Sequence, residues 1–147
     1  MDTALNLGAP PDAVQAAASA LGVVFPAELV AVWAVSNGLE LPGGWRFFPV
    51  FDGKEARKTS NHIVYENTKG RWEIMDPELV AIAYGDTGNA LVLRKSAMSL
   101  EPTVFVWDHE TRRTKKWSRD LAYVAAKAKA RVADIEKRIR RAMKGRP

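Results

Sequence analysis

The stretch ELVAIAYGDTGNALVL, residues 78–93, places two apolar runs around the short segment GDTGN. A phosphate-binding loop needs a strand before it and a helix after it, but the residues that follow Gly88 are strand-like and do not begin with a Lys-Ser or Lys-Thr pair. A calcium loop needs acidic residues at alternate positions, and only Asp86 is present. Two glycines with Asp86 and Asn89 suit a tight turn. The stretch therefore predicts a β-hairpin.

Further strands are predicted on both sides of this hairpin. TVFVWD (103–108) and RTKKWS (113–118) form a second pair joined by the polar segment HETR. WRFFPV (45–50) is a short aromatic strand that ends at its proline. Because short turns join neighbouring strands, we expect antiparallel pairing. The polar residues 52–70 are predicted to be a loop with a short helix around 53–59.

Helices are predicted at both ends of the chain. They cover residues 10–22, 26–38 and 118–143. In the second helix, Trp33 lies on an apolar stripe that predicts a place in the core, and Asn37-Gly38 is expected to end the helix in a left-handed conformation. Ser118 is the expected N-cap of the third helix, with Asp120 in its first turn.

The order of these elements predicts an α+β fold, with an antiparallel meander sheet covered by helices and a long C-terminal helix. The length of 147 residues fits one domain. Residues 127–147 hold nine Lys/Arg against two acidic residues, a charge of +7, whereas residues 1–126 hold 13 against 15, a charge of −2. We therefore divide the chain into an α+β domain over 1–126 and a basic helical extension over 127–147.

The composition narrows the class of protein. Cysteine is absent, which excludes disulfides, thiolate metal sites and cysteine nucleophiles and is typical of a reducing compartment. The first residues, MDTALNLGAPPD, have neither the basic nor the apolar region of a secretory signal. Residues 13–35 are apolar, but Gly22, Pro26 and Glu28 interrupt them too often for a membrane span. We expect a cytoplasmic protein without a membrane segment.

Histidine is the first candidate for catalysis or metal binding, and the chain has two, His62 and His109. His109 lies between acidic residues in WDHET, which suits a surface turn. A metal site, the alternative, needs several ligands, and His62 lies in a polar loop with no fixed relation to it. No serine lies in the pattern of a nucleophile elbow. We expect no catalytic residue, no cofactor and no metal site.

Contacts to a partner protein are predicted around Trp72, which follows a polar loop in TKGRWE. An aromatic residue beside an arginine is a common anchor of protein interfaces, and packing in the core or at a sheet edge is the alternative. Glu66, Glu73 and Asp76 are close to Trp72 in the sequence. Paired carboxylates of this kind serve in acid–base catalysis or in partner contacts, or they are solvated charges of a loop.

The basic extension has a regular apolar pattern. Its apolar residues step by four and three positions, and they are Leu121, Ala125, Ala128, Val132, Ile135, Ile139 and Ala142. This pattern predicts a helical seam, of which we take Val132, Ile135 and Ile139 as candidate contact residues. A helix over 118–143 would be about 39 Å long and would extend beyond a domain of this size. There are three interpretations of this helix: packing on the protein's own sheet, pairing in a homodimer or with a partner helix, and contact with nucleic acid or an anionic surface.

The chain resembles the SUKH superfamily, which includes the yeast cell-wall synthesis regulator family. Four segments carry the resemblance in this order: FPAELVAVWAVSNGLEL, GWRFFPV, ELVAIAYGDTGNALVL and TVFVWDHE. The matching positions are Pro26, Leu29, Asn37, Gly38, Phe48, Pro49, Ile82, Ala83, Gly85, Gly88, Asn89 and Asp108. The resemblance covers about residues 10–125. Two departures are Phe25, where members usually have leucine, and the long basic C-terminal helix.

The resemblance implies a non-enzymatic binding domain. Many bacterial members look like immunity proteins that neutralise toxins, often nucleases, and the fungal members are regulatory interaction modules. The expected mechanism is occlusion of a protein partner, which could be a toxin domain. The alternative is a nucleic-acid-associated regulator that grips phosphates with its basic C-terminal helix.

Overall fold

The computed structural model describes residues 8–53 and 61–145, and it confirms the α+β prediction. The helices are α1 (Pro11–Leu21), α2 (Ala27–Val35), α3 (Ile63–Glu66) and α4 (Leu121–Lys144). The strands are β1 (Glu40–Leu41), β2 (Trp45–Phe47), β3 (Leu79–Tyr84), β4 (Ala90–Ser96), β5 (Ser99–Leu100), β6 (Phe105–Trp107) and β7 (Thr114–Lys116).

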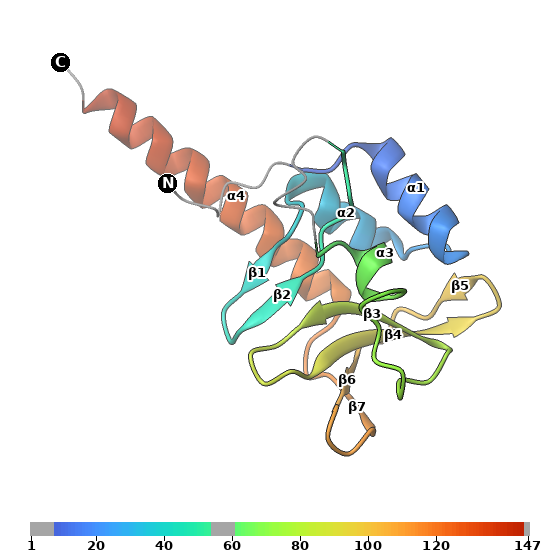
Figure 1. Ribbon diagram of the computed structural model, residues 1–147. Helices are drawn as coiled ribbons and strands as arrows, with labels where there is room; N and C mark the ends of the chain where they lie inside the picture. The colour runs from blue at the N-terminus through green and yellow to red at the C-terminus, as the bar shows by residue number, and fades with distance from the viewer. Residues whose placement is uncertain (1–7, 54–60, 146–147) are drawn as a thin grey trace.

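The strands form one 7-stranded sheet in the order β1-β2-β3-β4-β6-β7, with β5 paired to the end of β4. Every pair of neighbours is antiparallel, so the predicted meander is confirmed. In Figure 1, α1 and α2 lie together on one side of the sheet, and α4 runs from beside them to beyond the body. The sheet and the helices facing it enclose the core.

The segment GDTGN is the turn between β3 and β4, as predicted. Tyr84 pairs with Ala90 across the hairpin, and the backbone N–H of Gly85 donates to the carbonyl of Asn89 at 2.9 Å. Gly88 has φ +90°, which glycine adopts more readily than other residues. No group of acidic and histidine side chains capable of holding a metal ion occurs among the described residues, this turn included.

Two tryptophans anchor the core. Trp33 and Trp107 are each 1% exposed, and the indole N–H of Trp33 donates to the carbonyl of Phe48 at 2.9 Å. Phe25 packs edge-on against Trp33, with ring centres 4.8 Å apart. The predicted core position of Trp33 is therefore confirmed, and its polar atom is satisfied by the strand region it covers.

Two buried asparagines pair with backbone in the manner of a strand. Asn37 donates to the carbonyl of Val50 at 3.0 Å and accepts from its N–H at 2.8 Å. Asn67 makes the same pair of contacts with Ala81 of β3, each at 2.8 Å. Each amide group thus satisfies a backbone donor and acceptor that no neighbouring strand reaches.

Two local predictions were wrong, and three short elements were not predicted. The second helix ends at Val35 with an extended Ser36, so Asn37-Gly38 does not cap it, because the Asn37 amide is engaged with distant backbone. The N-cap of α4 is Asp120 and not Ser118, since the Asp120 carboxylate accepts the N–H of Tyr123 at 2.8 Å. β1, β5 and α3 were not predicted, because two-residue strands and a four-residue helix leave almost no periodic signal.

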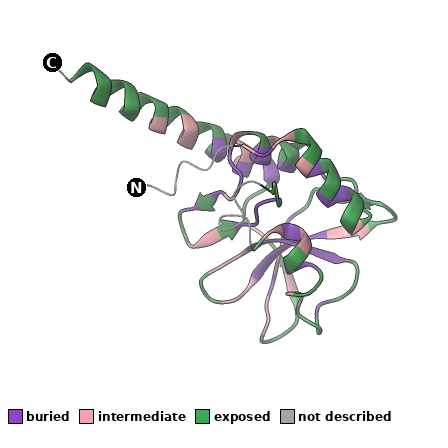
Figure 2. Ribbon diagram, turned by 45° about the horizontal axis from the view of Figure 1, so that its top comes forward, coloured by how far each residue is buried: buried purple, intermediate pink, exposed green. Residues whose placement is uncertain are grey.

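The short helix predicted around residues 53–59 falls almost entirely on positions outside the described part of the chain. Within that part, no helix is both long enough and apolar enough to cross a membrane. Figure 2 shows that the buried residues gather on the sheet and on the helices facing it, while the last turns of α4, residues 136–145, are exposed throughout.

Candidate functional site

Trp72 lies on the surface with one side of its ring held by two other rings. The indole stacks on His109 at 5.5 Å with 27° between the planes, and its centre is 5.8 Å from that of the buried Trp107. The residue nevertheless remains 38% exposed. The interpretation of Trp72 as a residue packed at the sheet edge is therefore confirmed, and its role in a partner contact stays a prediction.

The hairpin turn positions the histidine on which Trp72 stacks. Asn89 places its side-chain oxygen 2.9 Å from Nδ1 of His109 and also accepts the His109 backbone N–H at 3.3 Å. Gly88 lies beneath the imidazole, where a Cβ atom would come within 3.1 Å of its Cε1 atom. GDTGN thus has a role in the surface besides reversing the chain, since it fixes the ring that supports Trp72.

Apolar and acidic side chains surround Trp72. Ile74 is 39% exposed, and a shallow hollow of about 530 Å³ is lined by residues 70–74. Glu73 and Asp76 are both exposed. We call Trp72, Glu73, Ile74, Asp76 and His109 the Trp72 patch; it combines an aromatic and aliphatic centre with two carboxylates.

Arg71 is engaged with the backbone of the loop that carries this patch. Its guanidinium turns back to the loop, where it donates to the carbonyl oxygens of Leu79 at 2.9 Å and Met75 at 3.4 Å, and to that of Asp76. Burial lowers the pKa of Arg71, while the charges of Tyr84 and Asp76 oppose that effect. The arginine therefore shapes the loop that carries Trp72, and its positive charge interacts with the carboxylate of Asp76.

Glu66 is separated from the two exposed carboxylates. It ends α3 and is buried, so the interpretation of Glu66 as a solvated loop charge was wrong. Burial raises the pKa of its carboxyl, and the hydrogen bond that the Tyr84 hydroxyl donates to it partly offsets the rise. Burial, with the nearby Glu66 charge, also raises the pKa of Tyr84. Both residues line a hollow of about 390 Å³ that Arg46 also borders.

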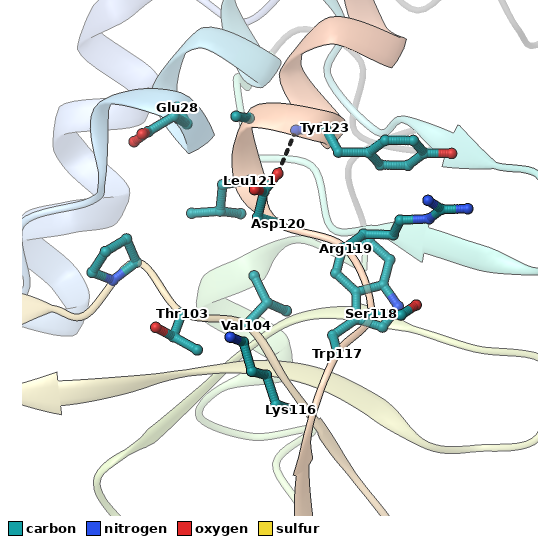
Figure 3. A pocket seen from close by; sticks show the side chains of 12 residues that line it. Glu28, Thr103, Val104, Lys116, Trp117, Ser118, Arg119, Asp120, Leu121 and Tyr123 are labelled. Carbon is teal, nitrogen blue, oxygen red and sulfur yellow. Dashed lines mark hydrogen bonds between the residues drawn. The ribbon is translucent and has the colours of Figure 1, made fainter.

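A further hollow, of about 570 Å³, lies at the start of α4 (Figure 3). Glu28 of α2 borders it on one side and Lys116 of β7 on another. Its other acidic residue, Asp120, is engaged in capping the helix, and the Arg119 guanidinium lies over the Tyr123 ring at 4.7 Å. The hollow contains no pair of groups arranged for acid–base or nucleophilic chemistry.

The helical seam divides into a packed part and an exposed part. Leu121, Val124 and Ala128 are buried, and α4 packs there against α2. Val132 and Ile135 are half-buried, and Ile139 is 45% exposed. The candidate seam residues therefore lie beyond the packed part of the helix.

Sequence reasoning missed His109 and Asn89 as parts of the surface around Trp72. The sequence interpretation of His109 was a residue of a surface turn, with a metal ligand as the alternative, and that of Asn89 was a turn residue. The one available signal was that both lie at ends of predicted strands, where adjacent hairpins of a meander bring their turns to the same edge. That signal predicts that the two turns lie close together, but it does not predict that the rings of Trp72 and His109 stack.

A sequence model described as the SMI1 / KNR4 family (SUKH-1) matches residues 8–124. The match covers the whole sheet with α1, α2 and α3, and it ends in the first turn of α4. No curated protein and no solved structure matches the chain. The sequence beyond residue 124, which includes most of α4, lies outside the matched region.

Proposed function

Because the chain belongs to the SMI1 / KNR4 family (SUKH-1), we propose that it is a non-enzymatic protein-binding module that neutralises a toxin by occluding it. The Trp72 patch is the observation that carries the proposal. A large aromatic side chain that is rigidly supported and partly exposed loses little conformational entropy on binding, and such residues are frequent anchors of interfaces. We assign the protein to the cytoplasm as part of this proposal.

The patch also suggests the charge of its partner. Glu73 and Asp76 lie beside Trp72 and Ile74, so a partner surface with lysine or arginine around an apolar centre would be complementary. Toxins that act on nucleic acid commonly present such basic surfaces, because they bind phosphate. Occlusion of a nuclease toxin is therefore the form of the function that the patch supports best. Glu66, which is buried, remains only a prediction as a contact residue.

The experiment is a growth assay with the genes adjacent to the gene for this chain. Each neighbour is expressed in a bacterial host with and without this protein, and we expect one neighbour to stop growth and this protein to restore it. Glu73→Lys should abolish the rescue while the melting temperature stays near that of the wild type. Trp72→Ala should abolish it as well and should also lower the melting temperature, because the indole packs on Trp107 and His109. Met98→Ala is the matched control, because Met98 is an exposed apolar residue away from the patch, 67% exposed on the turn between β4 and β5.

Two outcomes would contradict the proposal. Rescue that survives Trp72→Ala and Glu73→Lys would place the contact surface elsewhere. Failure to rescue growth from any toxic neighbour would remove the toxin-neutralising function.

A regulator bound to nucleic acid is the second candidate function, and the many exposed Lys and Arg side chains of α4 favour it. Its signature is an affinity for duplex DNA or RNA that falls steeply with salt.

A further inference from the structure

The outer half of α4 carries an apolar stripe with no described residue packed over its end. Residues three and four apart share a helix face, so Val132, Ile135 and Ile139 continue the face on which Leu121 and Ala128 are buried. Met143 extends the stripe and is 68% exposed. We call Val132, Ile135, Ile139 and Met143 the outer stripe.

The body of the protein stands beside the base of the outer stripe. Because the stripe continues the face of α4 that packs on α2, it looks toward the side of the helix where the domain lies (Figure 1). The outer half of α4 and the side of the domain thus meet at an angle, and we call the space between them the corner. A flat bilayer pressed onto the stripe would meet the domain first, whereas a single helix has the width to enter the corner.

The flanks of the stripe are basic. Residues 131–145 hold six Lys/Arg and two acidic residues, a net charge of +4. Arg131 and Arg138, seven positions apart, border one side of the stripe, and Glu136 and Arg140 lie on the other side. Asp134 is paired with Arg138 at 3.2 Å on the exposed surface, so part of the positive charge of that flank is already engaged within the helix.

A second copy of this chain fits the stripe poorly. In an antiparallel pair centred between Ile135 and Ile139, Arg138 would face Arg138 of the other copy and Glu136 would face Glu136. In a parallel pair, the packed half of the second α4 would occupy the space of the first domain. The charge pattern and the shape of the corner therefore both favour a different occupant.

We propose that the outer stripe docks an acidic amphipathic helix of a partner protein, with Val132, Ile135 and Ile139 as the apolar contacts and Arg131 and Arg138 as the charge contacts. The apolar side chains repeat at heptad spacing, which matches the facing side of a helix. The positive charges of Arg131 and Arg138 beside the stripe favour a partner helix with acidic side chains. This surface is separate from the Trp72 patch and goes beyond the function proposed for that patch.

The test uses the full chain and two synthetic heptad peptides labelled with a fluorophore. Both peptides have Ile at position a and Leu at position d; one has Glu at all e and g positions, and the other has Lys. We expect the Glu peptide to bind at least about tenfold more tightly than the Lys peptide, as measured by fluorescence anisotropy. Arg131→Glu with Arg138→Glu should reverse this preference.

The double variant Ile135→Lys and Ile139→Lys separates packing from charge. It removes two apolar contacts while adding two positive charges, so we expect the Glu peptide to lose at least about tenfold in affinity. Equal or tighter binding by this variant would show that charge alone attracts the peptide and would overturn the proposal. Circular dichroism should give an unchanged melting temperature, because Ile135 and Ile139 lie beyond the buried turns of α4.

Other occupants would give different results. The wild type could bind duplex DNA more tightly than the Glu peptide, and the double lysine variant could bind the DNA more tightly still. That result would make α4 a nucleic-acid surface. A dimer detected by sedimentation equilibrium and lost in the double variant would make the occupant a second copy. Binding to vesicles of phosphatidylserine that is lost in the double variant would make it a lipid surface. Each of these outcomes contradicts the proposal. Trp72→Ala should leave peptide binding unchanged, so the tests of the two surfaces are independent.

Discussion

The side-chain amide of Asn67 pairs with both backbone groups of Ala81, accepting its N–H and donating to its carbonyl at 2.8 Å each. Ala81 lies in β3, where the pairing with β4 shifts register between Ala81 and Ala83. β2 pairs with β3 only as far as Ala83, so Asn67 continues the ladder where that strand has ended. A loop asparagine thereby completes the edge of the central hairpin.

Asn67→Ala should lower the free energy of unfolding by about 2–4 kcal/mol, because it leaves the buried N–H and carbonyl of Ala81 without partners. Urea denaturation measures the change. Gln15→Ala is the control, since Gln15 is exposed on α1 and its side chain donates a long hydrogen bond of 3.4 Å to the exposed Ser19. A loss below about 0.5 kcal/mol for Asn67→Ala would show that water replaces the amide.

Gly88→Ala should destabilise the protein more than Gly22→Ala. Both glycines have positive φ, +90° and +67°, so both substitutions carry a backbone cost of about 1–2 kcal/mol. Nothing lies within 4 Å of a Cβ at Gly22, whereas a Cβ at Gly88 meets the His109 ring at 3.1 Å. Gly88→Val should be worse again, because a branched side chain resists positive φ. Equal melting temperatures for the two alanine variants would contradict this account.

Glu66→Gln should change how stability depends on pH. The pKa of Glu66 is raised in the folded protein above 4.5, so its contribution to stability is full below that value and is lost as pH rises through the folded pKa. The free energy of unfolding of the wild type should therefore rise relative to that of the variant as pH falls from neutral toward 4.5. Burial lowers the pKa of His62 from 6.5, which destabilises the fold in acid, but this effect is common to both proteins and cancels in the difference. A constant difference in unfolding free energy across this range would refute the assignment.

Truncation should locate the end of the part of α4 that supports the domain. Removal of residues 127–147 deletes Ala128, which is fully buried, and should lower the melting temperature. Removal of residues 130–147 keeps every buried residue of α4 and should leave it nearly unchanged. Replacing Arg138, Arg140 and Arg141 with glutamine should alter neither stability nor elution volume. Equal melting temperatures for the two truncated proteins would mean that Ala128 contributes nothing.

The purified protein should show no hydrolase or nuclease turnover. The chain has no cysteine, and the described residues contain no cluster able to hold a metal ion. Fluorogenic ester, phosphate and nucleic-acid substrates provide the measurement. A reproducible activity that His109→Ala or Glu66→Gln abolishes, with the fold intact, would replace the binding function with catalysis.

The central hairpin and the meander were predictable because their signals are local. An apolar run marks a buried strand, a turn between two such runs makes them antiparallel, and GDTGN supplies that turn. The seam of α4 was predictable for the same reason, since a repeat of three and four residues defines one face of a helix. Its projection beyond the domain followed from length alone, and the structure shows this projection (Figure 1).

The candidate site was predictable only through Trp72 and its acidic neighbours. His109 stacks on Trp72 although the two are far apart in the sequence, and Asn89 reaches His109 across 20 residues. No periodicity connects these positions. For Glu66 the exposure predicted from the sequence was wrong. Its polar sequence context predicted a solvated side chain, whereas packing of α3 against β3 buries the carboxyl beside Tyr84.

The sequence by itself determined which segments form strands and helices, how the hairpins reverse, and where the positive charge gathers. These properties depend on backbone preferences and on the alternation of apolar residues, which act over a few positions. Only the tertiary structure decided which side chains meet: Asn67 with Ala81, His109 with Trp72, and the inner turns of α4 with α2. Such contacts depend on how whole elements pack, because packing brings together residues that no local pattern connects.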